Sequence, residues 1–173
     1  MPQTAYGADK LGSELHARAA RKVHDLPTIG MRFFNVYGPR QNPASPYTGV
    51  ISIFSHRIAA GAPIQVHGDG RQVRDFINVV DVVRHLIAGM DHLAHSPRAE
   101  VVNVCTGRST SLLDLLQHLH DTTRSVLHGP ERAGDVRRSV GDPSAATALL
   151  GVEASVPLDV GLAALPVLVT AAA

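Results

Sequence analysis

The sequence has little of what marks several common protein classes. Its 173 residues include one cysteine, Cys105, and no tryptophan, and aromatic residues make up 4%. A single cysteine excludes an intramolecular disulfide framework and is typical of a reducing compartment. We therefore expect a cytoplasmic protein in which Cys105 is a small buried apolar residue rather than a nucleophile.

Long apolar runs and clustered charges are also absent. No segment is apolar over the length that spans a bilayer, and no basic leader precedes an apolar stretch. The 16 Lys and Arg residues are scattered among 15 Asp and Glu residues, which gives a net charge of +1. No stripe of basic and aromatic residues exists, so we expect neither a membrane partner nor a nucleic-acid partner.

Two kinds of ligand site lack their motifs. The pairs His92 with His95 and His118 with His120 have no cysteine or carboxylate set at ligand spacing, so no metal site is predicted. No G-x-G-x-x-G occurs anywhere in the sequence. Residues 68–70 (GDG) lack both the third glycine and a following helix, and are predicted to form a turn rather than a phosphate cradle.

Along the sequence, apolar residues recur with the period of a helix in some segments and of a strand in others. Apolar residues make up 45% of the 173 residues, which is enough for one hydrophobic core. The pattern predicts an α/β fold. The predicted helices and strands cover residues 6–24, 50–58, 81–93, 111–119 and 143–151 as helices and residues 28–36, 64–67 and 101–105 as strands. The expected helix ends are Asp81 as an N-cap, Ser111 with Asp114 as a capping box, and Gly151 as a stop.

Tyr6 and Lys10 form the most informative pair. Residues four apart lie on one face of a helix, so the Lys10 ammonium can hold the Tyr6 phenol and favour its phenolate, which is a base. The alternative is an ordinary surface pair, and for so short a pattern taken alone that alternative is favoured. Further motifs are needed to decide between them.

Five segments supply those motifs, in one order and register. They are residues 6–11 (YGADKL), 31–41 (MRFFNVYGPRQ), 68–76 (GDGRQVRDF), 102–107 (VNVCTG), and 132–135 (RAGD) followed by 142–144 (DPS). Together they resemble the NAD-dependent nucleotide-sugar epimerase/dehydratase family, the extended short-chain dehydrogenases, and within it the UDP-glucose 4-epimerases. The resemblance covers residues 2 to about 165.

The resemblance implies catalytic roles at the first two segments. Tyr6 is expected to take the proton from the sugar 4-hydroxyl while NAD accepts the hydride from C4, which gives a 4-keto sugar that is reduced again on its other face. Lys10 is expected to hold the nicotinamide ribose and to lower the Tyr6 pKa. Tyr37 and Pro39 are expected to border the nicotinamide.

The resemblance places the other named residues on the substrate, a nucleotide sugar and in particular a UDP-hexose. Asn35 is expected on the diphosphate, Arg74 and Arg132 on phosphates, and Asp135 on the ribose. Arginine forks match a diphosphate, and a carboxylate accepts hydrogen bonds from hydroxyls.

Simpler interpretations remain for some of these residues. Arg74 could pair with Asp75 at the surface, and Arg132 could be solvated; for the two arginines we favour the substrate. Val50 and Ile51 open a helix that approaches the nucleotide in relatives. For these two we favour a core position, because helical spacing already explains them.

The resemblance also sets the expected domain organisation. It implies the C-terminal part of a doubly wound Rossmann-type fold plus the smaller substrate-binding domain. Residues 1–48 would be the end of the dinucleotide-binding domain, and residues 49–173 mainly the nucleotide-sugar-binding domain, with segments returning to the Rossmann part. The glycine-rich turn of that family falls before Tyr6, so we expect this polypeptide alone to be poorly stable or self-associating, with little NAD affinity.

The function expected from these observations is that of an NAD-dependent nucleotide-sugar 4-epimerase, an isomerase, incomplete or inactive unless a separate N-terminal half completes it. Residues 45–51 (SPYTGVI) favour an epimerase over a dehydratase. The alternatives are a non-catalytic UDP-sugar-binding module, a module that forms a homodimer, or another family activity such as a dehydratase or decarboxylase.

Overall fold

The computed structural model describes residues 2, 4–42, 44–45, 48–96, 98–119 and 126–165. His120, Pro46 and Tyr47, which entered the sequence-based predictions, lie outside this part of the chain. The described elements are mixed α and β with parallel strand pairs, which confirms the predicted fold class.

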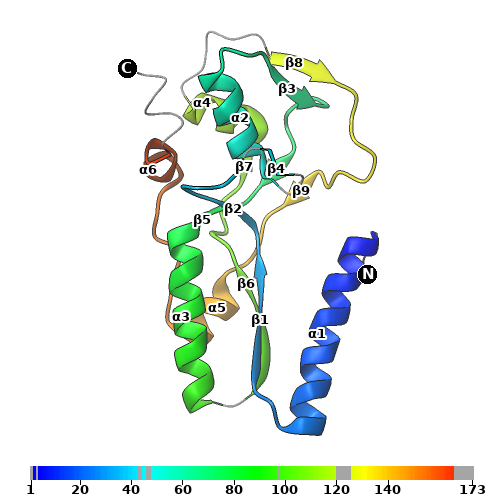
Figure 1. The fold of residues 1–173 in the computed structure, drawn as a ribbon, viewed down its shortest axis with the longest axis vertical. Coiled ribbons are helices and arrows are strands. Elements are labelled where there is room, and N and C mark those ends of the chain that lie inside the picture. The colour runs from blue at the N-terminus through cyan, green and yellow to red at the C-terminus, as the bar shows by residue number, and fades with distance from the viewer. Residues whose placement is uncertain are drawn as a thin grey trace.

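The long end of the molecule is a helix-strand-helix arrangement (Figure 1). Strands β1 (Thr28–Phe33) and β6 (Ala99–Val104) pair in parallel, with Gly30 opposite Val101. Helix α1 (Ala5–His24) lies on one side of this pair and α3 (Val79–His95) on the other, with α5 (Ser144–Leu150) beside α3. Helix α3 and strand β6, which follow residue 49 in the sequence, thus lie against β1. The domain boundary expected between residues 48 and 49 stays a prediction.

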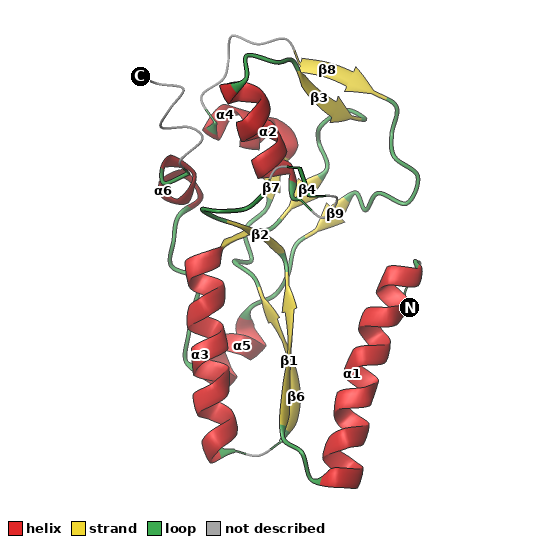
Figure 2. Ribbon diagram, in the orientation of Figure 1, coloured by secondary structure: helices red, strands yellow, loops and turns green. Residues whose placement is uncertain are grey.

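The other end carries the remaining strands in small groups (Figure 2). Strand β2 (Asn35–Tyr37) pairs in parallel with β5 (Phe76–Asn78), and β3 (Ile64–His67) in parallel with β8 (Val126–Gly129). Strand β4 (Val73–Arg74) lies between β7 (Thr110–Ser111) and β9 (Arg138–Ser139). The helices at this end are α2 (Val50–Ala59), α4 (Leu112–His118) and α6 (Leu158–Ala163).

The strongly periodic segments fold as predicted. Helix α1 begins after Thr4, whose hydroxyl accepts a hydrogen bond from the Gly7 N–H at 3.1 Å. The capping box of Ser111 and Asp114 is confirmed, and Gly151 ends α5 with φ 67°. Residues 68–70 form the predicted turn, in which both glycines have positive φ that a side chain would strain.

The prediction that Asp81 caps α3 is wrong. Asn78 is the N-cap and accepts from the Val80 N–H at 3.0 Å. Asp81 is fully buried in the first turn, where its carboxylate accepts from the N–H groups of Ser155 at 3.1 Å and Val156 at 2.9 Å. Burial would raise the pKa of Asp81, but these donors outweigh it and hold the pKa below its ordinary value.

Two clusters of buried apolar side chains hold the described elements together. One gathers residues of α2, β3, α4 and α6, including Ile51, Phe54 and Leu115. The other lies between α3, β6 and α5, with Val102 and Ala146 at its centre. Cys105 is fully buried at the end of β6, and burial, with the nearby Asp75 carboxylate, raises its pKa to about 11, which agrees with an inert residue.

Asp75 joins the segments between the two clusters. Its fully buried carboxylate accepts from Thr106 N at 2.9 Å, Thr106 Oγ1 at 2.7 Å, Gly107 N at 2.9 Å and Gly141 N at 3.4 Å. Its own N–H donates to the Ser139 carbonyl at 3.0 Å, and its carbonyl accepts from the Asn35 N–H at 3.0 Å. The interpretation of Arg74 and Asp75 as a surface pair is therefore wrong.

Replacing Asp75 tests this arrangement. Asp75→Asn keeps the shape but places an NH₂ group among hydrogen-bond donors, so we expect the free energy of unfolding to fall by about 3 kcal/mol. Urea denaturation followed by circular dichroism measures the change. Asp91→Asn, at an exposed aspartate on α3, is the matched control and should change stability by less than about 0.5 kcal/mol. Equal effects of the two variants would contradict the role given to Asp75.

Candidate functional site

Two cavities meet at Asn35. The first, here called the Tyr6 cavity, has a volume of about 590 Å³, and its walls include Tyr6, Asn35 and Ser139. The second, the Arg132 cavity, has a volume of about 210 Å³, and Arg132 is in its wall. Asn35 lines both cavities, so one extended ligand could contact both.

The Arg132 cavity contains most of the residues assigned to the substrate. Those in its wall are Asn35, Val50, Arg74, Arg132 and Asp135. They come from β2, α2, β4 and the segment before β9, which are far apart in sequence. Their convergence is what the motif pattern predicts, whereas their individual roles stay predictions.

Within this wall the two arginines differ. Arg74 pairs with the Asp135 carboxylate through Nη2 and donates from Nη1 to the Val136 carbonyl at 2.7 Å, and its side chain is only 16% exposed. Arg132 is exposed, and its carbonyl accepts from the Asp135 N–H at 3.1 Å in a tight turn. Arg74 is therefore held by a counter-charge, and Arg132 is the more accessible cation.

The neutral residues of this wall are positioned by the fold. Asn35 Nδ2 donates to the Asp75 carbonyl at 3.0 Å, which fixes the amide plane at the junction of the cavities. Val50 is the first residue of α2 and is partly buried against the core while lining the Arg132 cavity. Ile51 is 2% exposed and lies in the core, as the core interpretation predicts.

Tyr6 and Lys10 lie on the face of α1 that is turned toward β1, where both line a cavity between the helix and the strands. The Tyr6 side chain is 68% exposed, and Lys10 Nζ lies 5.3 Å from the centroid of its ring. The predicted spacing on one helix face is therefore confirmed. An ammonium against a phenol ring in an open cavity leaves the hydroxyl accessible to a substrate.

The structure does not bring Tyr37 or Pro39 to Tyr6. Tyr37 is 2% exposed in the core, its hydroxyl faces Gly161, and burial raises its pKa. Pro39 is exposed in the turn after β2. Neither residue lines the described cavities, so their contact with a cofactor stays a prediction.

Sequence reasoning missed other residues of the Tyr6 cavity. Ser139 lies in a two-residue strand, which is too short for a periodic signal. Gln41 closes the second motif segment and could have been found from it. Its side chain accepts from Ser52 Oγ at 2.6 Å, which ties the motif to α2.

An ion pair links α1 to β1 beside the site. Arg32 Nε and Nη2 donate to the two carboxylate oxygens of Glu14 at 2.6 Å and 2.7 Å. The Glu14 side chain is 16% exposed, and the hydrogen bond from Arg32 holds the pKa of Glu14 below its ordinary value.

Comparison with known proteins finds relatives that resemble this chain in sequence. The model of the NAD dependent epimerase/dehydratase family matches residues 1–105. The chain is 32% identical to dTDP-L-rhamnose 4-epimerase of Burkholderia thailandensis, with 93% of this chain and 45% of that protein covered. It is 33% identical to UDP-glucose 4-epimerase of Mycolicibacterium smegmatis, with 94% of this chain and 51% of that protein covered.

A solved structure has a similar fold. UDP-glucose 4-epimerase of Thermotoga maritima, solved with UDP-glucose, superposes with a TM-score of 0.87 at 34% identity, covering 98% of this chain and 54% of that one. The chain thus spans about half the length of the curated relatives it matches. Among its described helices, none has the length and apolar character of a bilayer-spanning segment.

The Arg32–Glu14 pair gives a pH dependence that can be measured. Because the pKa of Glu14 is lower in the folded chain than in the unfolded chain, its stabilising contribution is present above the unfolded value of about 4.5 and is lost as the pH falls through the folded value. The free energies of unfolding of the unaltered protein and of Glu14→Gln, measured by urea denaturation, should therefore differ at pH 7, and the difference should shrink as the pH falls below the ordinary pKa of a glutamate. A difference that is constant over this range would contradict the pairing.

Proposed function

Because this chain belongs to the NAD-dependent epimerase/dehydratase family, we propose that it binds a nucleotide sugar and acts in its epimerisation at C4. The observation that carries the proposal is the junction at Asn35. One cavity holds the expected base, Tyr6, and the adjoining cavity holds the expected phosphate and ribose contacts. A nucleoside diphosphate sugar has the same two parts.

The Arg132 cavity supplies groups suited to the nucleoside diphosphate. The exposed Arg132 guanidinium and the Asn35 amide would hold the diphosphate, and Asp135 would accept from the ribose. Arg74 would contribute positive charge near the phosphates while its ion pair with Asp135 holds that carboxylate in place for the ribose hydroxyls. Val50 would provide the apolar edge at the start of α2.

The Tyr6 cavity would take the hexose. Tyr6 would accept the proton of the 4-hydroxyl and return it, and Lys10 beside the ring would favour the deprotonated phenol during that step. NAD, when bound, supplies the hydride acceptor. The hydroxyl of Tyr6 and the ammonium of Lys10 would suit the nicotinamide riboside of NAD, because both can hydrogen-bond to its ribose hydroxyls.

For the adenosine part of NAD, the sequence lacks the glycine-rich motif that the family uses. Residues 1–173 contain no G-x-G-x-x-G turn, so we propose that turnover needs a glycine-rich dinucleotide-binding half supplied in addition. Apolar side chains that are exposed on α3 agree with a contact to such a half or to a second copy of this chain. They include Val83, Ile87 and Met90, the last 72% exposed.

The sugar and the nucleotide are open within the family. A dTDP-sugar epimerase and a UDP-sugar epimerase match this chain at almost equal identity, and the segment at residues 45–51 favours a 4-epimerase over a dehydratase. A non-catalytic nucleotide-sugar-binding module is the second candidate. It is favoured by the fact that the Arg132 cavity is formed by residues 1–173 themselves.

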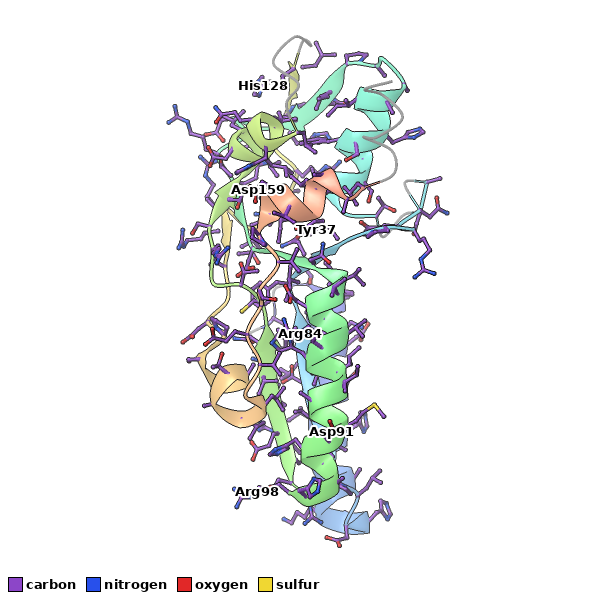
Figure 3. All side chains as sticks on the ribbon, turned by 90° about the vertical axis from the view of Figure 1, so that its left-hand side faces the viewer. Tyr37, Arg84, Asp91, Arg98, His128 and Asp159 are labelled. Atoms are coloured by element: carbon purple, nitrogen blue, oxygen red, sulfur yellow. The ribbon has the colours of Figure 1, made fainter. Side chains whose placement is uncertain are left out.

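Binding can be tested without turnover. Isothermal titration of UDP-glucose into the protein should give a Kd that rises about tenfold or more in Arg132→Ala, because a charge-assisted contact to phosphate is lost. Arg98→Ala is the control, since Arg98 lies at the opposite end of the molecule from His128 of β8 (Figure 3). Equal affinities of the two variants would contradict a diphosphate site at Arg132, and a parallel titration of dTDP-glucose ranks the nucleotides.

Turnover separates the two candidate functions. With NAD and the dinucleotide-binding half of a relative supplied as a separate polypeptide, interconversion of UDP-glucose and UDP-galactose should appear, and Tyr6→Phe should lower it by about 100-fold or more. The Kd for UDP-glucose should stay unchanged in that variant. If UDP-glucose binds but the unaltered protein gives no turnover, the enzyme proposal fails and the binding module stands. If Tyr6→Phe turns over as fast as the unaltered protein, the role of Tyr6 as the base fails.

A further inference from the structure

Helix α1 is held only loosely against the strands. None of its residues is buried, and Leu15 and Val23 are 56% and 70% exposed. A cavity of about 770 Å³ lies between α1 and the strand pair, with Lys10 and Leu11 on one wall and Gly30 and Val101 on the other. Apolar packing therefore does little to fix where α1 lies.

The Glu14–Arg32 pair crosses this cavity. Both residues line it, and two parallel hydrogen bonds of 2.6 Å and 2.7 Å join the carboxylate on α1 to the guanidinium on β1. A planar fork of this kind restrains direction as well as distance, unlike a single contact. The Glu14 side chain is 16% exposed, whereas its partner Arg32 is 54% exposed, so the pair lies at the edge of the cavity with its carboxylate the more covered of the two groups.

The pair is geometrically connected to Tyr6. Tyr6, Lys10 and Glu14 are spaced by four residues and follow one face of α1, and Glu14 lies about 12 Å along the axis from Tyr6. Arg32 lines the Tyr6 cavity as well, three residues before Asn35. A rotation or a slide of α1 relative to β1 would therefore move the Tyr6 hydroxyl relative to Asn35.

We propose that Glu14 and Arg32 are a positioning pair that fixes α1 on β1 and so holds the Tyr6 hydroxyl over the cavity it shares with Asn35. This rests on the proposed function for the role of Tyr6, but not for the fixing of α1. An ordinary surface ion pair would instead contribute little to stability and leave the helix where other contacts place it.

The first measurement follows the helix itself. In Glu14→Gln and in Arg32→Gln, hydrogen exchange of the amides in α1 should speed up by about tenfold. In Arg32→Lys it should speed up nearly as much, because lysine keeps the charge but loses the two parallel hydrogen bonds of the guanidinium. The double variant should be no worse than either single one, since both remove the same interaction. Asp9→Asn and Lys22→Gln are matched charge changes at exposed positions of the same helix that leave Arg32 in place, and should leave exchange unchanged.

The second measurement reports on Tyr6. With ¹³C-labelled tyrosine, and with the Tyr6 signal assigned by Tyr6→Phe, the ring cross-peak should shift or broaden in the Glu14 and Arg32 variants and stay in place in the two controls. In the complemented enzyme assay the same variants should lower kcat without raising the Kd for UDP-glucose. This split separates positioning of Tyr6 from a general loss of stability, which would weaken binding as well.

The outcomes are distinguishable from failure of the proposed function. If UDP-glucose does not bind to the unaltered protein, the proposed function fails, while exchange and the Tyr6 signal still test the pair. Unchanged exchange and an unchanged Tyr6 signal in both Glu14→Gln and Arg32→Gln would overturn the positioning role. Full retention of the native pattern by Arg32→Lys would overturn the requirement for the fork.

Discussion

The buried carboxylate of Asp75 is the constraint on which the candidate site depends. A buried charge is costly unless hydrogen-bond donors surround it, and here four donors from residues 106, 107 and 141 do so. The main chain of the same residue bonds to Asn35 and Ser139. The strand that carries Arg74 is thereby fixed to β2 and β9, so that segments from three parts of the sequence form one wall.

The site therefore has two parts: the Arg132 cavity, which is firmly held by buried elements, and the Tyr6 helix, which has no buried residue. The Arg132 cavity lies between elements that share the larger apolar cluster, and its polar groups are oriented by main-chain hydrogen bonds and by the Arg74–Asp135 pair. Helix α1, which carries Tyr6 and Lys10, has no buried residue and meets the strands across a wide cavity. Under the proposed function, the nucleotide would bind in the firmly held part of the site, and the position of Tyr6 would depend on polar contacts such as the pair of Glu14 with Arg32.

The sequence predicted best those features that depend on neighbouring residues alone, such as helical periodicity and helix caps. Helical spacing predicted α1 and α2 nearly to their ends, and the Ser111–Asp114 box predicted the start of α4. Asp81 was misplaced because its partners, Ser155 and Val156, lie more than 70 residues away and no local pattern shows them. Strands β4, β5, β7 and β9 and helix α6 were missed for a similar reason, since they are too short to carry a period of their own, whereas β2 falls largely within the strand predicted over residues 28–36.

For the site, the motifs predicted which residues converge but not how they are engaged. Asn35, Arg74, Arg132 and Asp135 do line one cavity, yet the pairing of Arg74 with Asp135 rather than Asp75 depends on tertiary structure. Tyr37 belongs to a motif segment and nevertheless lies in the core, where its hydroxyl faces Gly161 of α6, a contact about 120 residues away that no local pattern shows. Ser139 entered the site only through the position of β9 beside β4.

The central claim is that one nucleotide sugar spans both cavities, with its hexose at Tyr6 and its diphosphate at Arg132. Isotope-filtered NOE spectroscopy of UDP-glucose bound to the ¹³C-labelled protein tests this most directly. The account predicts cross-peaks between the Tyr6 ring protons and the hexose protons, together with cross-peaks from the Arg132 side chain to the ribose. Bound UDP-glucose whose hexose gives no cross-peak to Tyr6, while its ribose contacts a different surface, would contradict it.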